Sequence, residues 1–87
     1  MQVKYHRRFI KNYRRRVVSN RKLVIRFEQR LSLRLNDPEN VVLRDHQLVG
    51  KKSQYRSFSI AGDIRVVYIL EKDAILLYDI GSHNQVY

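Results

Sequence analysis

Five residues in the second half of the chain have the side-chain types that proton transfer and charge neutralisation require. They are His46, Asp63, Arg65, His83 and Tyr87. His46 falls in a predicted loop before the strands, and His83 follows the last predicted strand. Functional side chains concentrate at such element ends, although a surface or capping role is the ordinary alternative for each histidine.

This set of side chains can cleave RNA without a metal ion. The ribose 2′-OH attacks the adjacent phosphorus and the 5′-oxygen leaves, which produces a cyclic phosphate. Histidine, with an unperturbed pKa of about 6.5, can act as the base or the acid. Arginine supplies positive charge for the phosphorane, and tyrosine can stack on a base or donate a proton. We predict no metal and no other cofactor, because the two histidines have no third ligand at a sequence spacing typical of metal sites.

Arg65 opens a predicted strand whose neighbouring residues are apolar. One interpretation is a structural ion pair with Asp63, which lies two residues away and so on the same face of a regular strand. The other is a phosphate clamp, because guanidinium donors match phosphate oxygens. The residue types leave both interpretations open.

The basic charge of the chain is confined to its first 35 residues. Eighteen Lys and Arg against eight Asp and Glu give a net charge of +10. Residues 1–35 carry +11 and residues 36–87 carry −1. Such asymmetry favours a polyanionic partner. Nucleic acid ranks first, an acidic protein second and an anionic membrane third, and the alternative is that the charge only maintains solubility.

Two amphipathic helices are expected in the basic segment. The first has a helical apolar stripe, and basic side chains between its members should face water. The stripe comprises Phe9, Ile10, Tyr13 and Val17, and the basic side chains are Arg7, Arg8, Lys11, Arg14, Arg15 and Arg16. The second helix should start near Ser19 as the N-cap and end at Asn36-Asp37-Pro38, with Arg34 and other basic residues mostly off its apolar stripe. A short turn between the helices predicts an antiparallel hairpin.

The rest of the chain has the shorter period of strands. Residues 54–60, 64–70 and 74–80 are rich in β-branched and aromatic residues, with tight connections between them, and residues 3–5 could add a fourth strand. The sequence therefore predicts an α+β fold, with the hairpin packed on one face of a three- to four-stranded, mostly antiparallel sheet. At 87 residues, the whole range 1–87 is one predicted domain.

The composition also indicates in which cellular compartment the protein is expected. The chain has no cysteine, which agrees with a reducing compartment. It contains neither an apolar stretch long enough to span a membrane nor a signal-peptide pattern. We therefore expect a cytoplasmic protein without a membrane partner.

Four stretches, taken in order, resemble the RelE/ParE toxin superfamily and specifically its YafQ-like branch. Residues 45–50 (DHQLVG) resemble the H-x-L-x-G loop, and Tyr55-Arg56 opens the next strand as it does there. Residues 62–68 (GDIRVVY) resemble the turn and the R-hydrophobic-hydrophobic-Y strand, and residues 81–87 (GSHNQVY) resemble the closing G-x-H-x-x-x-[F/Y]. Each motif is short, but their order, the chain length and the preceding basic hairpin make the set specific.

The resemblance implies a microbial RNase-like fold and a ribosome-dependent endoribonuclease that cuts mRNA in the A site. It also implies a cognate antitoxin that neutralises the toxin. By position, Arg65 falls on the phosphate-binding arginine, and four residues fall on catalytic positions of the branch: His46, Asp63, His83 and Tyr87. His46 is then assigned as the base and His83 as the acid, with the reverse left open, Asp63 orienting a histidine or the ribose, and Tyr87 positioning a base.

Basic side chains would then hold RNA through its phosphates, which supply affinity without sequence information. The residues predicted for this role are Arg7, Arg8, Lys11, Arg14, Arg15 and Arg56.

One departure from the YafQ-like pattern concerns Ser59. Members of the branch can carry another histidine at this place, and serine is a poor proton carrier near neutral pH. The departure implies slower cleavage, a different division of labour or lost activity. Two other functions stay open: a ParE-type toxin that inhibits DNA gyrase without RNA chemistry, and an RNA-binding module that leaves mRNA intact.

Overall fold

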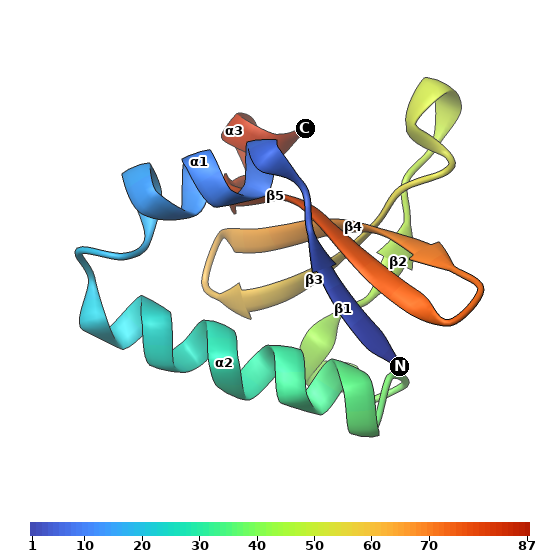
Figure 1. Cartoon of the computed structure of the whole chain (residues 1–87), viewed down its shortest axis with the longest axis horizontal. Coiled ribbons are helices and arrows are strands. Elements are labelled where there is room, and N and C mark those ends of the chain that lie inside the picture. Colours follow the sequence, from blue (N-terminus) through green and yellow to red (C-terminus); the bar gives the residue numbers. More distant parts are fainter.

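The basic N-terminal segment forms two helices, as the spacing of its apolar residues predicts. In a computed structural model that describes all residues 1–87, α1 spans Arg7–Arg16 and α2 spans Arg21–Asn36. The Asn20 side chain accepts a hydrogen bond from the Leu23 amide and caps α2, so this helix begins after Asn20 rather than after Ser19. The chain reverses between the two helices (Figure 1), and the ring of Phe27 lies 5.7 Å from that of Phe9.

The remaining elements build a five-stranded sheet in the order β1-β5-β4-β3-β2. The strands are β1 (Gln2–Tyr5), β2 (His46–Gln47), β3 (Arg56–Ala61), β4 (Ile64–Glu71) and β5 (Ala74–Ser82). Only the β1–β5 pair is parallel. The sheet has one strand more than predicted, because the two-residue β2 is too short to show a period.

The core lies between the two long helices and one face of the sheet. Its eleven buried side chains form a single cluster: Phe9, Val17, Phe27, Leu43, Phe58, Ile60, Val66, Tyr68, Ile75, Leu77 and Ile80. Burial of this apolar surface is the main stabilising contribution to such a fold. The predicted α+β architecture is therefore confirmed.

The other face of the sheet carries polar residues near its centre. Because side chains alternate along a strand, Ser57 and Ser59 of β3 and Arg65 of β4 point away from the core. The short helix α3 (His83–Val86) follows β5 directly and buries Val86. This face therefore places polar groups beside the closing segment of the chain.

Two arginines of the helices are drawn into the protein, although Arg16 was expected to face water and Arg34 to lie off the apolar stripe. Arg16 donates to the Ile80 carbonyl at 2.9 Å, and Arg34 is 7% exposed and donates to the Tyr68 hydroxyl at 3.0 Å. Ile10, expected on the apolar stripe, is exposed. Helical period cannot reveal an arginine that pairs with a buried carboxylate on another element. None of the helices has the length and apolar character needed to cross a membrane.

Candidate active site

His46, His83 and Tyr87 come together around one hollow of about 600 Å³. Its lining consists of His46, Gln47, Leu48, Val49, Lys52, His83 and Tyr87. The imidazole of His83 meets the ring of Tyr87 edge to face, with centroids 4.5 Å apart. Three of the five residues singled out in the sequence therefore share one cavity, although His46 lies far along the chain from His83 and Tyr87.

His46 lies on the edge strand β2, opposite Ser57 of β3. Its Nδ1 lies 3.0 Å from the Arg44 carbonyl oxygen. A carbonyl only accepts, so this bond requires the proton on Nδ1 and leaves Nε2 of the neutral ring with a free lone pair. Such a ring is set up to take a proton through Nε2. Ser57 also links the segments, because its hydroxyl contacts the Tyr87 hydroxyl.

Asp45, the residue before His46, is held by a largely buried network. Its carboxylate pairs with Arg34 Nε at 2.8 Å and with Arg56 Nη2 at 2.9 Å, and it accepts a hydrogen bond from the Tyr68 hydroxyl. The Asp45 and Arg34 side chains are only 7% and 9% exposed. The network joins α2, β3 and β4 to the residue that precedes His46, so it fixes where β2 begins.

The same network changes the ionisation of its members. Burial raises the pKa of the Tyr68 phenol above its ordinary value, and the hydrogen bond to Asp45 acts in the same direction. Burial lowers the pKa of Arg56, but hydrogen bonds to Tyr68 and Asp45 outweigh it and the net shift is upward. Both groups therefore keep their protons across the physiological range.

The raised pKa of Tyr68 predicts a loss of stability at alkaline pH. A group whose pKa is higher in the folded state stabilises fully below its unfolded pKa, which is about 10 for tyrosine, and this contribution is lost as the pH rises through the folded value. Urea unfolding at about pH 8 and about pH 11 should therefore show a smaller drop in the free energy of unfolding for Tyr68→Phe than for the unchanged protein. An equal drop in the two proteins would contradict the burial of this phenol.

The segment that carries His83 is anchored at the end of β5. The Ser82 and Gln85 side chains form a capping box around the first turn of α3, and Asp63 accepts a hydrogen bond from the His83 amide at 3.3 Å. A Cβ at Gly81 would lie 2.7 Å from the Arg16 Nη1 and from the Gln85 Oε1. A side chain at this position would therefore displace the ends of the Arg16 and Gln85 side chains, which bond to Ile80 and Ser82.

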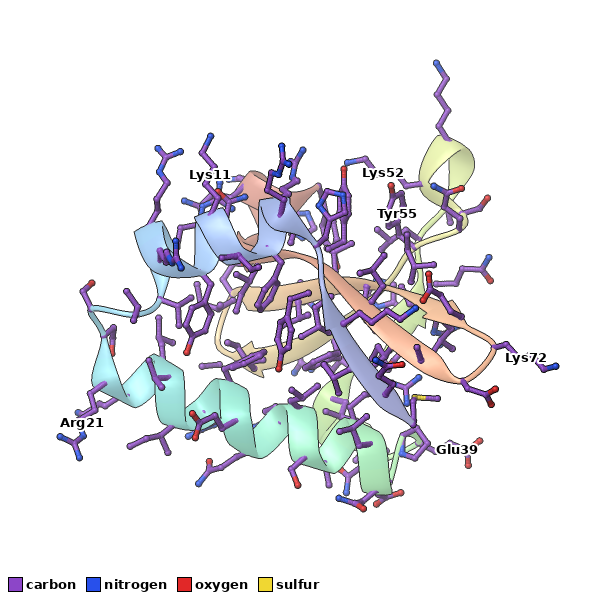
Figure 2. The ribbon with its side chains drawn as sticks, in the orientation of Figure 1. Lys11, Arg21, Glu39, Lys52, Tyr55 and Lys72 are labelled. Carbon is purple, nitrogen blue, oxygen red and sulfur yellow. The ribbon has the colours of Figure 1, made fainter.

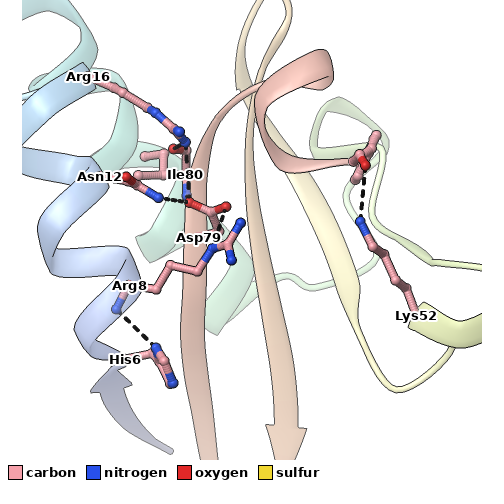
Figure 3. A network of polar contacts seen from close by, with 8 residues as sticks. His6, Arg8, Asn12, Arg16, Lys52, Asp79 and Ile80 are labelled. Carbon is pink, nitrogen blue, oxygen red and sulfur yellow. Dashed lines mark hydrogen bonds and ion pairs between the residues drawn. The ribbon is translucent and has the colours of Figure 1, made fainter.

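A second buried carboxylate, Asp79, ties α1 to β5 (Figure 3). Asp79 is 1% exposed and accepts hydrogen bonds from Asn12 Nδ2 at 2.7 Å and Arg8 Nε at 3.1 Å. Arg16 Nη1 lies 3.4 Å from the same carboxylate. The hydrogen bond to Asp79 raises the pKa of the Arg8 guanidinium. This network holds the part of β5 that leads into Gly81 and α3.

Arg65 makes no ion pair with Asp63, which corrects the structural interpretation of this residue. Asp63 instead accepts a hydrogen bond from the His83 amide. The Arg65 Nε and Nη1 are buried without any hydrogen-bond partner in the protein. Arg65 pairs with Ser59 on one side and Gly81 on the other. It therefore lies next to the start of the His83 segment. Buried unpaired donors are rare and costly, so two on one guanidinium make Arg65 a candidate for binding an oxyanion.

The six basic residues assigned to RNA do not form one group. Arg7, Arg8 and Lys11 line a polar hollow on α1, and Arg15 is exposed one turn beyond Lys11. Arg14 instead borders an apolar groove between α1 and α2. The Arg56 guanidinium is engaged by Asp45. A contact of Arg56 with RNA stays a prediction, and the structure gives this side chain a second role.

Sequence reasoning missed the residues that hold the site together. Asp45, Asp79, Tyr68, Arg34, Ser57 and Lys52 were not predicted to act there. Asp79 could have been noticed, because an aspartate within the apolar stretch AILLYDI is unusual for a buried strand. The partners of Asp45 and Ser57 could not, since they depend on strand pairing. Nowhere does a group of three His, Cys, Asp or Glu side chains lie close enough to hold a metal ion.

The fold is shared with small bacterial toxins of known structure. It superposes on a copper-bound mutant toxin from Helicobacter pylori with a TM-score of 0.80, at 25% identity over 100% of this chain and 99% of that chain. It also matches the E. coli DinJ–YafQ toxin–antitoxin complex (TM-score 0.77, 18% identity, 99% and 96% covered) and a YoeB/ParE toxin from Agrobacterium tumefaciens (TM-score 0.81, 15% identity, 95% and 99% covered). No curated protein matches the sequence significantly.

The fold and the pocket thus define a toxin of the RelE/ParE type. The family model described as "Bacterial toxin of type II toxin-antitoxin system, YafQ" matches residues 1–87, and the chain belongs to this family. The resemblance found in the sequence motifs is confirmed.

Proposed function

We propose that this YafQ-family toxin is a metal-independent endoribonuclease that cleaves mRNA on the ribosome. The observation that carries the proposal is the pocket in which His46, His83 and Tyr87 meet. Arg65, which has two buried unpaired donors, does not line this pocket, but it pairs within the sheet with Gly81, two residues before His83. A non-catalytic RNA-binding module or a gyrase inhibitor needs neither a pair of histidines at one cavity nor a buried guanidinium without partners.

The hydrogen bond of the His46 ring suggests which histidine accepts the first proton. Nε2 of His46 takes the proton of the ribose 2′-OH, because Nδ1 is committed to the Arg44 carbonyl. The 2′-oxygen then attacks phosphorus, and the bond from phosphorus to the 5′-oxygen breaks. His83 in its protonated form gives a proton to the departing 5′-oxygen. The products are a 2′,3′-cyclic phosphate and a 5′-hydroxyl, so protons and charges balance.

Arg65 stabilises the extra negative charge on the phosphorane. Fixed donors aimed at the place where charge develops are typically the largest single contribution to such catalysis. The backbone of Arg65 lies between Ser59 and Gly81 in the sheet, and its Nε and Nη1 have no partner in the protein, so these donors are free for the phosphorane oxygens.

Asp63 and Tyr87 act by positioning. Asp63 holds the His83 amide at 3.3 Å and so sets the start of α3. Tyr87 contacts both His83 and Ser57 and lines the pocket, where its ring positions a base. Ser59 lies opposite Arg65, where another histidine can stand in this branch. We therefore assign both proton transfers to His46 and His83, and Ser59 takes neither.

The partners follow the same proposal. The exposed basic side chains of α1, with Arg7 and Lys11 among them, bind ribosomal RNA or mRNA phosphates. A cognate antitoxin neutralises the protein, as the E. coli complex of YafQ with DinJ suggests for this family. An acidic antitoxin segment would complement the +11 charge of residues 1–35.

Induced expression of the toxin, followed by primer extension on cellular mRNA, tests this function. We expect new in-frame 5′ ends in translated messages, and none in cells that express His83→Ala. Circular dichroism of the variant controls for folding. Growth arrest with a DNA-damage response and intact mRNA would instead indicate gyrase inhibition and would contradict the proposal.

A further inference from the structure

A second, smaller hollow adjoins the catalytic pocket. It has a volume of about 120 Å³ and is lined by Arg8, Lys52, Tyr55, Val67, Tyr78 and Val86. Lys52 lines both hollows and donates to the Tyr87 carbonyl at 3.1 Å, so the two are directly connected. Lys52 and Tyr55 lie together on the side of the molecule that also carries Lys11, opposite Arg21 and Glu39 (Figure 2).

The aromatic wall of this hollow depends on a β-bulge. The register of β4 with β5 passes from Val67↔Asp79 to Tyr68↔Leu77, which leaves Tyr78 as the extra residue. Bulges re-aim side chains and are common next to active sites. Here the bulge lets Tyr78 face the hollow, while the neighbouring Asp79 bonds to α1.

Tyr78 belongs to a short row of aromatic rings. Its centroid lies 4.9 Å from that of Tyr55 and 4.8 Å from that of His6. The guanidinium of Arg8 lies over the Tyr78 ring at 5.4 Å and is oriented by Asp79 through Nε. The hollow therefore combines flat apolar walls with two cations at its rim, Arg8 and Lys52.

Basic charge continues beyond Arg8. This residue also lines the polar hollow on α1, together with His6, Arg7, Lys11, Asn12 and Arg16. Three neighbouring hollows thus form one track: the catalytic pocket, the aromatic hollow joined to it by Lys52, and the basic hollow joined by Arg8. Alternation of stacking surfaces and cations along a track is typical of proteins that bind single-stranded nucleic acid.

We propose that the aromatic hollow binds the unpaired base of an RNA nucleotide that flanks the cleaved bond, with Tyr55 and Tyr78 as its stacking surface. Lys52 and Arg8 then contact the phosphates on either side of that nucleotide. The hollow is too small for an ordinary small-molecule ligand, whose sites measure about 300–1,000 Å³, but it admits one planar ring. The proposal rests on the nuclease function for its substrate, although RNA binding can be measured without cleavage.

Fluorescence anisotropy with a labelled 2′-O-methyl octa-adenylate, which cannot be cut, tests the site. Tyr55→Ala and Tyr78→Ala should each weaken binding by roughly 5- to 150-fold, the usual effect of removing one base–aromatic stack. Tyr55→Phe and Tyr78→Phe keep the ring and should bind within about twofold of the unchanged protein. Tyr5→Ala, an exposed tyrosine outside the track, is the matched control.

The salt dependence separates stacking from charge. The alanine variants should keep the slope of log affinity against log salt, because they remove no cation. Lys52→Gln should reduce that slope by about 0.7, as expected for the loss of one phosphate contact to a single strand. Circular dichroism of the alanine variants separates the loss of a stacking surface from a loss of fold.

The outcomes distinguish this site from the nuclease function. If the unchanged protein binds the oligonucleotide through Tyr55 but cuts no mRNA on ribosomes, the nuclease function fails and the site stands. If mRNA is cut while both alanine variants bind like the unchanged protein, or if the unchanged protein does not bind the oligonucleotide, the site is overturned.

Discussion

Replacing Arg65 by alanine should lower mRNA cleavage by about 100- to 1,000-fold, the usual effect of losing one group that stabilises a developing oxyanion. The stability of the protein should stay the same or rise. Two guanidinium nitrogens of Arg65 are buried without partners in the protein, and such donors typically cost about 1–3 kcal/mol each in desolvation. A residue that is costly for folding and needed for activity is typical of a functional site.

Three measurements check this expectation. Cleavage of mRNA by reconstituted ribosomes gives the activity, and urea unfolding gives the stability. Inorganic phosphate should raise the melting temperature of the unchanged protein more than that of Arg65→Ala, because only the former offers the oxyanion site. Arg21→Ala, at an exposed position at the start of α2 (Figure 2), is the matched control and should change none of the three. Full activity of Arg65→Ala would remove this residue from the mechanism.

Replacing Asp45 by asparagine should cost about 3–5 kcal/mol of stability, the usual effect of removing one partner of a buried ion pair. The substitution leaves Arg34, 9% exposed in its side chain, without its counter-charge. Such a loss is a large share of the roughly 5–15 kcal/mol that stabilises a typical domain. Arg56 is less affected, because its side chain is 35% exposed and can turn to solvent.

Urea unfolding of Asp45→Asn and of Asp73→Asn, an exposed aspartate in the β4–β5 turn, measures the difference. The Asp73→Asn control should stay within about 0.5 kcal/mol of the unchanged protein. Adding Arg34→Met to Asp45→Asn should recover part of the loss, because it removes the uncompensated charge. If Asp45→Asn costs less than about 1 kcal/mol, the network does not anchor the segment that carries His46.

The parts of the fold that follow a simple period could be predicted from the sequence. The helical spacing of Phe9, Tyr13 and Val17 and the β-branched runs 64–70 and 74–80 led to the correct elements. β2 has only two residues, and Tyr78 is placed by a bulge, so neither could be read from a period. The helical period also gives no sign that Arg16 and Arg34 pair with carboxylates, because these partners are distant in sequence.

The candidate site could likewise be predicted only in part from the sequence. The identities of His46, His83 and Tyr87 came from short motifs, and the structure places all three at one pocket. Their order in the chain does not reveal how they meet. The meeting depends on the pairing of β2 with β3 and on the contact of Ser57 with Tyr87. The sequence left both an ion pair with Asp63 and a phosphate clamp open for Arg65, and in the structure Asp63 bonds to the His83 amide instead.

The two halves of the chain now have distinct roles. The helical first third holds all the excess positive charge, but its Arg8, Arg16 and Arg34 also form ion pairs with buried carboxylates of the sheet half. Under the proposed function, charge in this protein therefore serves both RNA binding and the positioning of the catalytic segments. The Asp79 network acts on the strand that leads to His83, and the Asp45 network acts on His46.

Whether the toxin cleaves RNA through the ribose 2′-OH is tested most directly by replacing that hydroxyl with hydrogen at one position of the mRNA. Purified toxin is added to ribosomes that carry a defined mRNA, first to map the cleaved bond and then with a 2′-deoxynucleotide on the 5′ side of that bond. We expect the unmodified mRNA to give fragments ending in a 2′,3′-cyclic phosphate and a 5′-hydroxyl, and the substituted bond to stay intact. Cleavage of the 2′-deoxy bond at the same rate would exclude attack by the 2′-OH.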